Sequence, residues 1–114
     1  MTLKSSVKSE GVQGPIWYAC GIAEMVYRTN GLEFIVTSLA DSHETRPASL
    51  HNKGLAVDLR TRHVPHELLQ TIRRSISRAL RPMGFDVILE TDHMHIEFDP
   101  KDGKNWQRLD TQIA

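Results

Sequence analysis

Two short stretches of this chain gather side chains that bind metals and move protons. In "SLHNKGLAVDLR", residues 49–60, His51 and Asp58 lie seven positions apart on either side of Gly54. In "ETDHMHIE", residues 90–97, three carboxylates and two histidines fall within eight positions at the end of an apolar run. Unpaired charges that are buried cost several kcal/mol or become neutral, and a divalent cation would relieve that cost. The two stretches are therefore candidate halves of one metal site.

The residue types favour zinc held by nitrogen and oxygen. Catalytic zinc commonly takes three protein ligands and leaves a fourth position for water. His51, Asp58 and one of the two histidines in residues 90–97 would supply such a set. A nearby carboxylate can then take the proton of the zinc-bound water and pass it to a leaving amine. Asp92 and Glu90 are both candidates for that general base.

Each stretch also has a plainer explanation when it is taken alone. A histidine and an aspartate seven residues apart can be a coincidence, and "DHMH" can be the solvated tip of a hairpin. His63 and His66 lie at the start of an expected helix, where solvation explains them. Both stretches lie at expected strand ends, and this common position favours the metal site.

The pattern of apolar residues predicts the elements that would position the first stretch. Residues 1–14 are polar and predict an N-terminal arm. Residues 15–31 predict a helix, because the segment opens on proline and closes on Asn-Gly, with Cys20 inert on its buried side. Residues 32–38, "LEFIVTS", predict a strand from their β-branched and apolar content.

The second half of the chain predicts one strand, one helix and a hairpin. Residues 55–60 alternate between an apolar and a charged face. Residues 65–84 form the clearest amphipathic helix, with arginines off the apolar stripe. Residues 85–90 and 95–99 bracket a tight polar turn and resemble the two arms of a hairpin. The order predicts an α+β fold in which helices cover one side of a small, mostly antiparallel sheet.

Length and composition narrow the possible functions. The 114 residues suffice for a single domain, expected over residues 15–114 after the arm. The 14 acidic and 14 basic side chains balance, so the whole chain offers no field to hold nucleic acid or an anionic membrane. Cys20 is the single cysteine, which excludes an intramolecular disulfide and thiolate zinc sites. No apolar run approaches a membrane span, and we expect synthesis in the cytoplasm without a signal peptide.

The first stretch carries a family signature. "SLHNKGLAVDLR" resembles the S-x-H-x-x-G-x-A-x-D signature of the zinc D-alanyl-D-alanine carboxypeptidases and the related phage L-alanyl-D-glutamate endopeptidases. "DHMHIE" is similar to the second element of that family, an acid followed three residues later by a histidine. The resemblance covers about residues 34–100 and implies a Hedgehog/D,D-peptidase-like fold. The residues at the signature positions are Ser49, His51, Gly54, Ala56 and Asp58.

The resemblance gives individual residues a role. His51 and Asp58 would be zinc ligands, and His95 would be the third, because an apolar residue and an acid follow it as in the family. Asp92, three residues earlier, would be the general base. Gly54 would permit a backbone conformation or a close approach that a side chain would block.

One alternative stays open within this resemblance. Glu90 and His93 have the same acid-x-x-histidine spacing, so a slip of two residues would exchange both roles. Under the first assignment, His93 is a neighbour of the metal ligands or a group on the substrate side that stabilises the tetrahedral intermediate. Arg46, upstream of the signature, is the candidate for binding a substrate carboxylate or the oxyanion, and His43 is a second candidate for that task.

The implied activity is hydrolysis of peptidoglycan stem peptides at a bond involving a D-amino acid. The enzyme would be a D,D-carboxypeptidase or an L-alanyl-D-glutamate endopeptidase of bacteriophage or prophage origin, an endolysin that degrades the cell wall after release, or a virion-borne one. We expect a monomer that neither binds nucleic acid nor inserts into membranes. The alternative is a catalytically silent zinc-containing binding or virion structural module, since Hedgehog domains keep a zinc site yet serve as binding proteins. A domain without metal is the third possibility.

Overall fold

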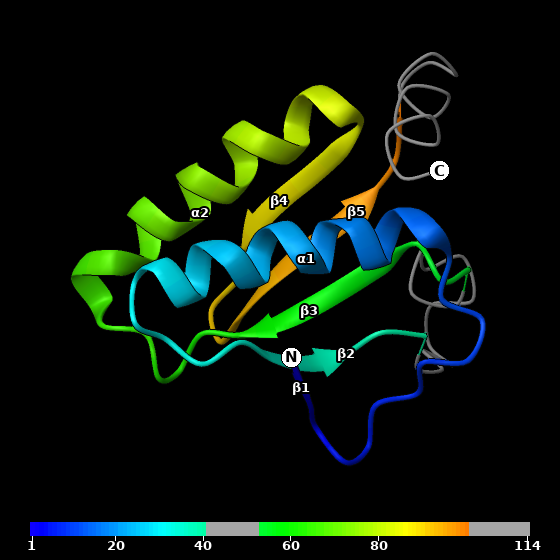
Figure 1. Ribbon diagram of the computed structural model, residues 1–114, viewed down its shortest axis with the longest axis horizontal. Coiled ribbons are helices and arrows are strands. Elements are labelled where there is room, and N and C mark those ends of the chain that lie inside the picture. Colours follow the sequence, from blue (N-terminus) through cyan, green and yellow to red (C-terminus); the bar gives the residue numbers. More distant parts are fainter. Residues whose placement is uncertain (41–52, 101–114) are drawn as a thin grey trace.

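The chain folds into a five-stranded sheet with two helices packed on one face (Figure 1). The computed structural model describes residues 1–40 and 53–100. The strands lie in the order β1-β2-β3-β5-β4. The elements are β1 (Thr2–Leu3), α1 (Gly14–Thr29), β2 (Ile35–Ser38), β3 (Ala56–Arg60), α2 (His66–Leu80), the 3-10 turn η1 (Arg81–Met83), β4 (Phe85–Leu89) and β5 (His93–Phe98).

The α+β class is confirmed, but the sheet is mixed and not mostly antiparallel as the sequence predicted. The pairs β2–β3, β3–β5 and β4–β5 are antiparallel. β1 pairs parallel with β2 through Thr2↔Ile35 and Leu3↔Val36. This strand lies within the expected polar arm, and two residues are too few to give a strand pattern. Its pairing with a distant segment is what defines it.

The helices lie where the sequence predicted them. α1 has Pro15 in its first turn, and Gly31, just beyond its capping residue, adopts a left-handed φ of 72° that favours glycine. α2 ends at Leu80 and passes into η1, which contains Pro82. Within the part of the chain that the structure describes, no helix combines the length and the apolar content needed to cross a membrane.

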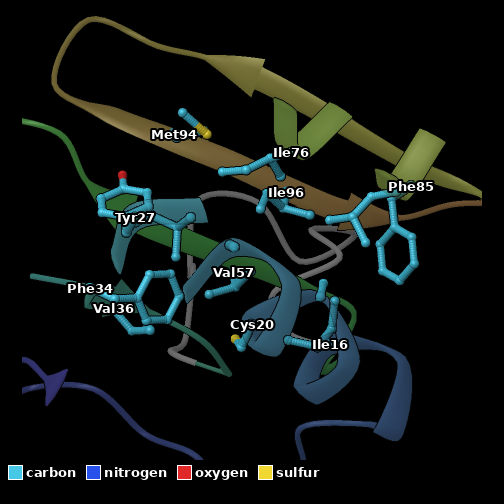
Figure 2. Close-up of a cluster of buried hydrophobic side chains, with 14 of the residues drawn as sticks. Ile16, Cys20, Tyr27, Phe34, Val36, Val57, Ile76, Phe85, Met94 and Ile96 are labelled. Carbon is cyan, nitrogen blue, oxygen red and sulfur yellow. The ribbon is translucent and has the colours of Figure 1, made fainter. Parts of the chain in front are cut away.

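The hydrophobic core lies between the two helices and the sheet. α1 contacts β3 and β5, α2 contacts β4, and the helices contact each other. Figure 2 shows Cys20 of α1, Ile76 of α2, Val57 of β3 and Ile96 of β5 in this core. Burying each large apolar side chain contributes roughly 1.5–3 kcal/mol. Cys20 is 1% exposed, which confirms its expected position, and burial raises the pKa of its thiol to about 12.

Alternation along the strands divides the sheet into an apolar face and a polar face. In β5, the side chains of Met94, Ile96 and Phe98 are buried against the helices. Because successive strand residues point to opposite sides, the residues between them belong to the other face. We call this side the polar face, and its members include Thr37, Asp58, Arg60, His93, His95 and Glu97.

The predicted hairpin is formed by β4 and β5. The backbone N–H of Glu90 donates to the carbonyl of His93 at 2.8 Å and closes the turn. β5 begins at His93, two residues earlier than the predicted strand. Met94 is fully buried, so the "DHMH" stretch is not a solvated hairpin tip but the start of a strand that belongs to the core on one side.

Candidate metal centre

Asp58 and His95 lie directly opposite each other on the neighbouring strands β3 and β5. The distance between His95 Nδ1 and Asp58 Oδ1 is 2.8 Å, and their side chains are only 18% and 15% exposed. The other ring nitrogen, Nε2, lies 2.9 Å from Glu97 Oε1. The hydrogen bond to Asp58, assisted by Glu97, raises the pKa of His95 against the opposing effect of burial. One imidazole is thus held between two carboxylates.

His93 links this pair to the hairpin turn. Its Nδ1 lies 2.7 Å from Asp92 Oδ1, and its Nε2 lies 3.8 Å from Asp58 Oδ1. The hydrogen bond from His93 lowers the pKa of the Asp92 carboxyl, and the charge of Arg62, whose Nη2 is 4.0 Å from Asp92 Oδ2, acts in the same direction. Asp92 is therefore ionised near neutral pH, which is the state that a general base requires.

A pocket of about 330 Å³ lies on the polar face beside these groups. Asp58, Asp92 and His93 line it, whereas Glu90 is not among its lining residues. The pocket therefore joins one predicted ligand, the preferred base and the neighbouring histidine. Its other lining residues are ones that the sequence did not single out: Lys4, Ile35, Thr37, Ser38, Arg60 and Arg62.

The pocket residues that the sequence analysis missed differ in whether a sequence pattern could have identified them. Arg60 follows Asp58 by two positions in the same strand, so alternation alone puts it on the same face. Ser38 lies opposite Asp58 because the register between β2 and β3 shifts between Val36 and Ser38. An irregularity of this kind is common next to functional sites but leaves no mark in the sequence. Lys4 reaches the pocket only because β1 joins the sheet.

Gly54 of the signature has a steric explanation. Its φ is 72°, and a Cβ added here would lie 2.0 Å from the carbonyl oxygen of Gly11. Gln13 fixes the same contact, since its backbone N–H donates to Gly54 O at 3.0 Å and its Nε2 donates to Lys53 O at 2.8 Å. The prediction that glycine allows a close approach is confirmed. The approach anchors the segment before α1 against the turn into β3.

The remaining predicted residues lie outside the described part of the chain. His43, Arg46, Ser49 and His51 all fall within residues 41–52. The predicted zinc ligand His51 and the predicted Arg46 therefore lie outside the described residues.

Three carboxylates form a second group along the hairpin. Oxygens of Asp86, Glu97 and Asp99 lie within 4.8 Å of one another, and among residues 1–40 and 53–100 no other trio of potential ligands meets this criterion. Carboxylate oxygens of this kind suit a hard cation such as Mg²⁺ or Ca²⁺, although exposed acids often cluster without one. This trio differs from the predicted ligand set and shares no member with it.

The donor chemistry of the Asp58–His95 pair fits zinc better than that of the acidic trio. Zinc takes imidazole nitrogen and carboxylate oxygen together. A histidine that binds a metal usually donates its other ring N–H to a carboxylate, which fixes the tautomer. Glu97 occupies that position at His95 Nε2, which leaves Nδ1 as the nitrogen directed at Asp58.

Comparison with known proteins supplies no relative from which roles could be transferred. No protein-family model, curated protein or solved structure matches this chain. The function is therefore argued from the geometry of the polar face and from the sequence signature.

Proposed function

We propose that this protein is a zinc-dependent peptidase that cleaves a bond involving a D-amino acid in peptidoglycan stem peptides. The observation that carries the proposal is the contact between His95 Nδ1 and Asp58 Oδ1 at 2.8 Å. Asp58 also lines the pocket on the polar face, together with Asp92 and His93. These are the residues to which the signature assigns metal binding and proton transfer. The finer fold assignment, Hedgehog/D,D-peptidase-like, belongs to the same proposal.

In the proposed mechanism, Asp58 and His95 would hold the metal, and the signature names His51 as the third ligand. Zinc, when bound, would polarise the scissile carbonyl and lower the pKa of a water molecule to about 7. Asp92 would accept a proton from the attacking water on its carboxylate and pass it to the leaving amine. His93 would orient Asp92 through Nδ1. Because it also lines the pocket, it is our candidate for stabilising the developing oxyanion.

Asp92 is preferred to Glu90 as the base because of its position. Asp92 lines the pocket with Asp58, whereas Glu90 is not among the lining residues. The cations Arg60 and Arg62 line the same pocket and are suited to a carboxylate of the stem peptide. Together they favour an anionic peptide as substrate, with Arg46 as a further candidate for that task.

The decisive experiment compares two carboxylate removals within one hairpin. Purified wild type, Asp92→Ala and Glu90→Ala are analysed for bound zinc and incubated with defined stem peptides, and the products are identified by mass spectrometry. We expect Asp92→Ala to retain zinc and to lose about 10²–10⁴-fold in kcat, the usual contribution of a general base, while Glu90→Ala stays near wild type. The masses of the products distinguish a carboxypeptidase from an endopeptidase.

Two results would contradict this proposal in different ways. A large loss in Glu90→Ala with an active Asp92→Ala would reverse the assignment of the base. Zinc-loaded wild type that leaves every stem peptide intact would instead identify a silent zinc-containing binding or virion module. The proposal includes action on the cell wall after phage-type release or from a virion.

A further inference from the structure

A groove lined by arginines lies on the outer side of α2. Its volume is about 410 Å³. Arg74, Arg78 and Arg81 follow one another at spacings of four and three residues, which places them on one stripe of the helical surface. With a rise of about 1.5 Å per residue, this stripe extends over about 10 Å. The lining residues are Arg73, Arg74, Ser77, Arg78, Arg81 and Pro82.

The positive charge of this groove is not explained by the stability of the helix. Like charges three or four residues apart destabilise a helix by a few tenths of a kcal/mol per pair, roughly 0.2–0.5. The negative end of the helix dipole favours Arg78 and Arg81 in or just after the last turn, but Arg73 and Arg74 lie in the middle of α2. Arg73 donates to Gln70 Oε1 at 2.8 Å. Within residues 1–40 and 53–100, no carboxylate forms an ion pair with any of these four arginines.

We propose that this arginine groove binds a linear phosphodiester polymer without bases, of the poly(glycerol phosphate) type. The guanidinium group presents paired N–H donors that match two phosphate oxygens at once. Several guanidinium groups along about 10 Å of helix engage more than one phosphate of a flexible chain. The groove thereby gives the protein a second binding surface, separate from the pocket on the polar face.

A nucleic acid and a lipid bilayer fit the groove less well. Proteins that bind single-stranded nucleic acid combine positive charge with aromatic side chains on which bases stack, and none of the lining residues is aromatic. A helix that lies on a membrane needs an exposed apolar side. The apolar side of α2, with Ile72, Ile76 and Leu80, is buried, and the large exposed apolar residues belong to other parts of the described chain: Met1, Leu3, Trp17, Met25 and Ile88.

The balanced net charge of the chain does not oppose this assignment. Equal numbers of acidic and basic residues led us to expect no polyanion partner, but the balance describes only the sum. The acidic Asp58, Asp92 and Glu97 gather on or beside the polar face, whereas α2 carries Glu67 as its one acid, in the first turn. The arginines of α2 thus outnumber its single acid, and the groove keeps a local positive field.

The test measures binding of fluorescent poly(glycerol phosphate) to the full chain at several salt concentrations. We expect saturable binding that weakens at least about tenfold, or 1.4 kcal/mol, in the double variant Arg74→Gln/Arg78→Gln. The slope of log affinity against log salt should become shallower by about 1.4, because two phosphate contacts of about 0.7 each are lost. Arg74→Lys/Arg78→Lys should lose less. Arg28→Gln, which removes an exposed arginine from α1, should bind like wild type.

Parallel titrations identify the ligand and separate this proposal from the peptidase. Equal or tighter binding of oligothymidylate or of phosphatidylglycerol vesicles would overturn the choice of polymer. Unaltered binding in Arg74→Gln/Arg78→Gln, with native circular dichroism, would overturn the site. Asp92→Ala should bind the polymer as wild type does, so a failure of the proposed catalysis leaves this result unchanged.

Discussion

His95 holds the central place in the candidate site because its two ring nitrogens face two different carboxylates. Nδ1 faces Asp58 and Nε2 faces Glu97. If Nδ1 binds the metal with Asp58, Glu97 becomes the group that orients the ring. The sequence contained all three residues but assigned no role to Glu97 beyond its place after the histidine. Its contact arises because residues 95 and 97 share one face of β5.

We predict that Glu97→Gln weakens zinc binding without unfolding the protein. Loss of the carboxylate partner of a metal-bound histidine commonly costs 10–100-fold in affinity. Competition with a chelating dye measures the zinc affinity, and Asp86→Asn is the matched control, since Asp86 lies opposite Glu97 on β4. If Asp86→Asn weakens zinc as much as Glu97→Gln, the ion binds the acidic trio and not the Asp58–His95 pair.

For Gly54, we predict that substitution by alanine lowers the free energy of unfolding, whereas the same substitution at the control position, Gly21, raises it. Alanine at this position requires an unfavourable φ and collides with the carbonyl oxygen of Gly11, so Gly54→Ala should cost about 3 kcal/mol. Gly21 lies inside α1 with open space around it, and Gly21→Ala should stabilise by about 0.5–1 kcal/mol. Urea unfolding measures both. Equal effects would mean that the segment before α1 does not pack against Gly54.

At the scale of elements, sequence patterns predicted the helices and strands that depend on interactions between residues close together in the chain. Both helices, the strand before the signature and the hairpin were predicted, because proline, glycine and apolar spacing act within a few residues. The parallel pairing of β1 and the register shift between Val36 and Ser38 were not predicted. Each depends on a partner twenty or more residues away, as the Ser38↔Asp58 and Thr2↔Ile35 pairs do. Thr2 and Leu3, inside the expected polar arm, form β1 for this reason.

The arginine groove on α2 makes a separate prediction for that helix. Arg74→Glu replaces a repulsive pair with Arg78 by an attractive pair at a spacing of four residues, so the free energy of unfolding should rise by roughly 0.5–1 kcal/mol. Thermal unfolding measures the change. Gln70→Glu, which changes the net charge by one unit and adds an attractive partner four residues before Arg74 without removing a cation, should stabilise by a smaller amount. A loss of stability in Arg74→Glu would mean that the stripe is not self-repulsive.

At the scale of the whole molecule, one face of the sheet packs against the helices and the other face carries the candidate site. The face toward the helices forms part of the core. The polar face brings Asp58 together with His95, which lies 37 residues later in the chain, and with His93. The sequence predicted this meeting from the metal-binding residue types at two expected strand ends and from the family signature. Alternation alone gives the face of each strand but not its neighbour. The position of Asp92 in the pocket likewise depends on how the hairpin packs against β3.

The buried thiol and phenol of the core predict that the whole fold weakens in alkali. Burial raises the pKa of Cys20 from its ordinary 9.0 to about 12, and burial also raises the pKa of Tyr27, whose hydroxyl donates to the carbonyl of Arg60 at 2.9 Å. Below pH 9 the thiol is protonated in both the folded and unfolded chains and contributes no pH dependence. Between about pH 9 and 12 the unfolded chain loses the proton while the folded chain keeps it, so stability must fall as pH rises.

The contribution of Cys20 to this slope approaches about 1.4 kcal/mol per pH unit. Urea unfolding from pH 8 to 11 measures it, and Cys20→Ala is the informative variant. Its stability at pH 8 will be lower because a core atom is removed, but its loss between pH 9 and 11 should be smaller than that of wild type. Tyr27→Phe should flatten the curve from a higher pH, since phenol ionises later than thiol in an unfolded chain. Parallel curves for wild type and Cys20→Ala would show that the thiol ionises as freely in the folded protein as in the unfolded one, and that the core between α1 and the sheet is open to water.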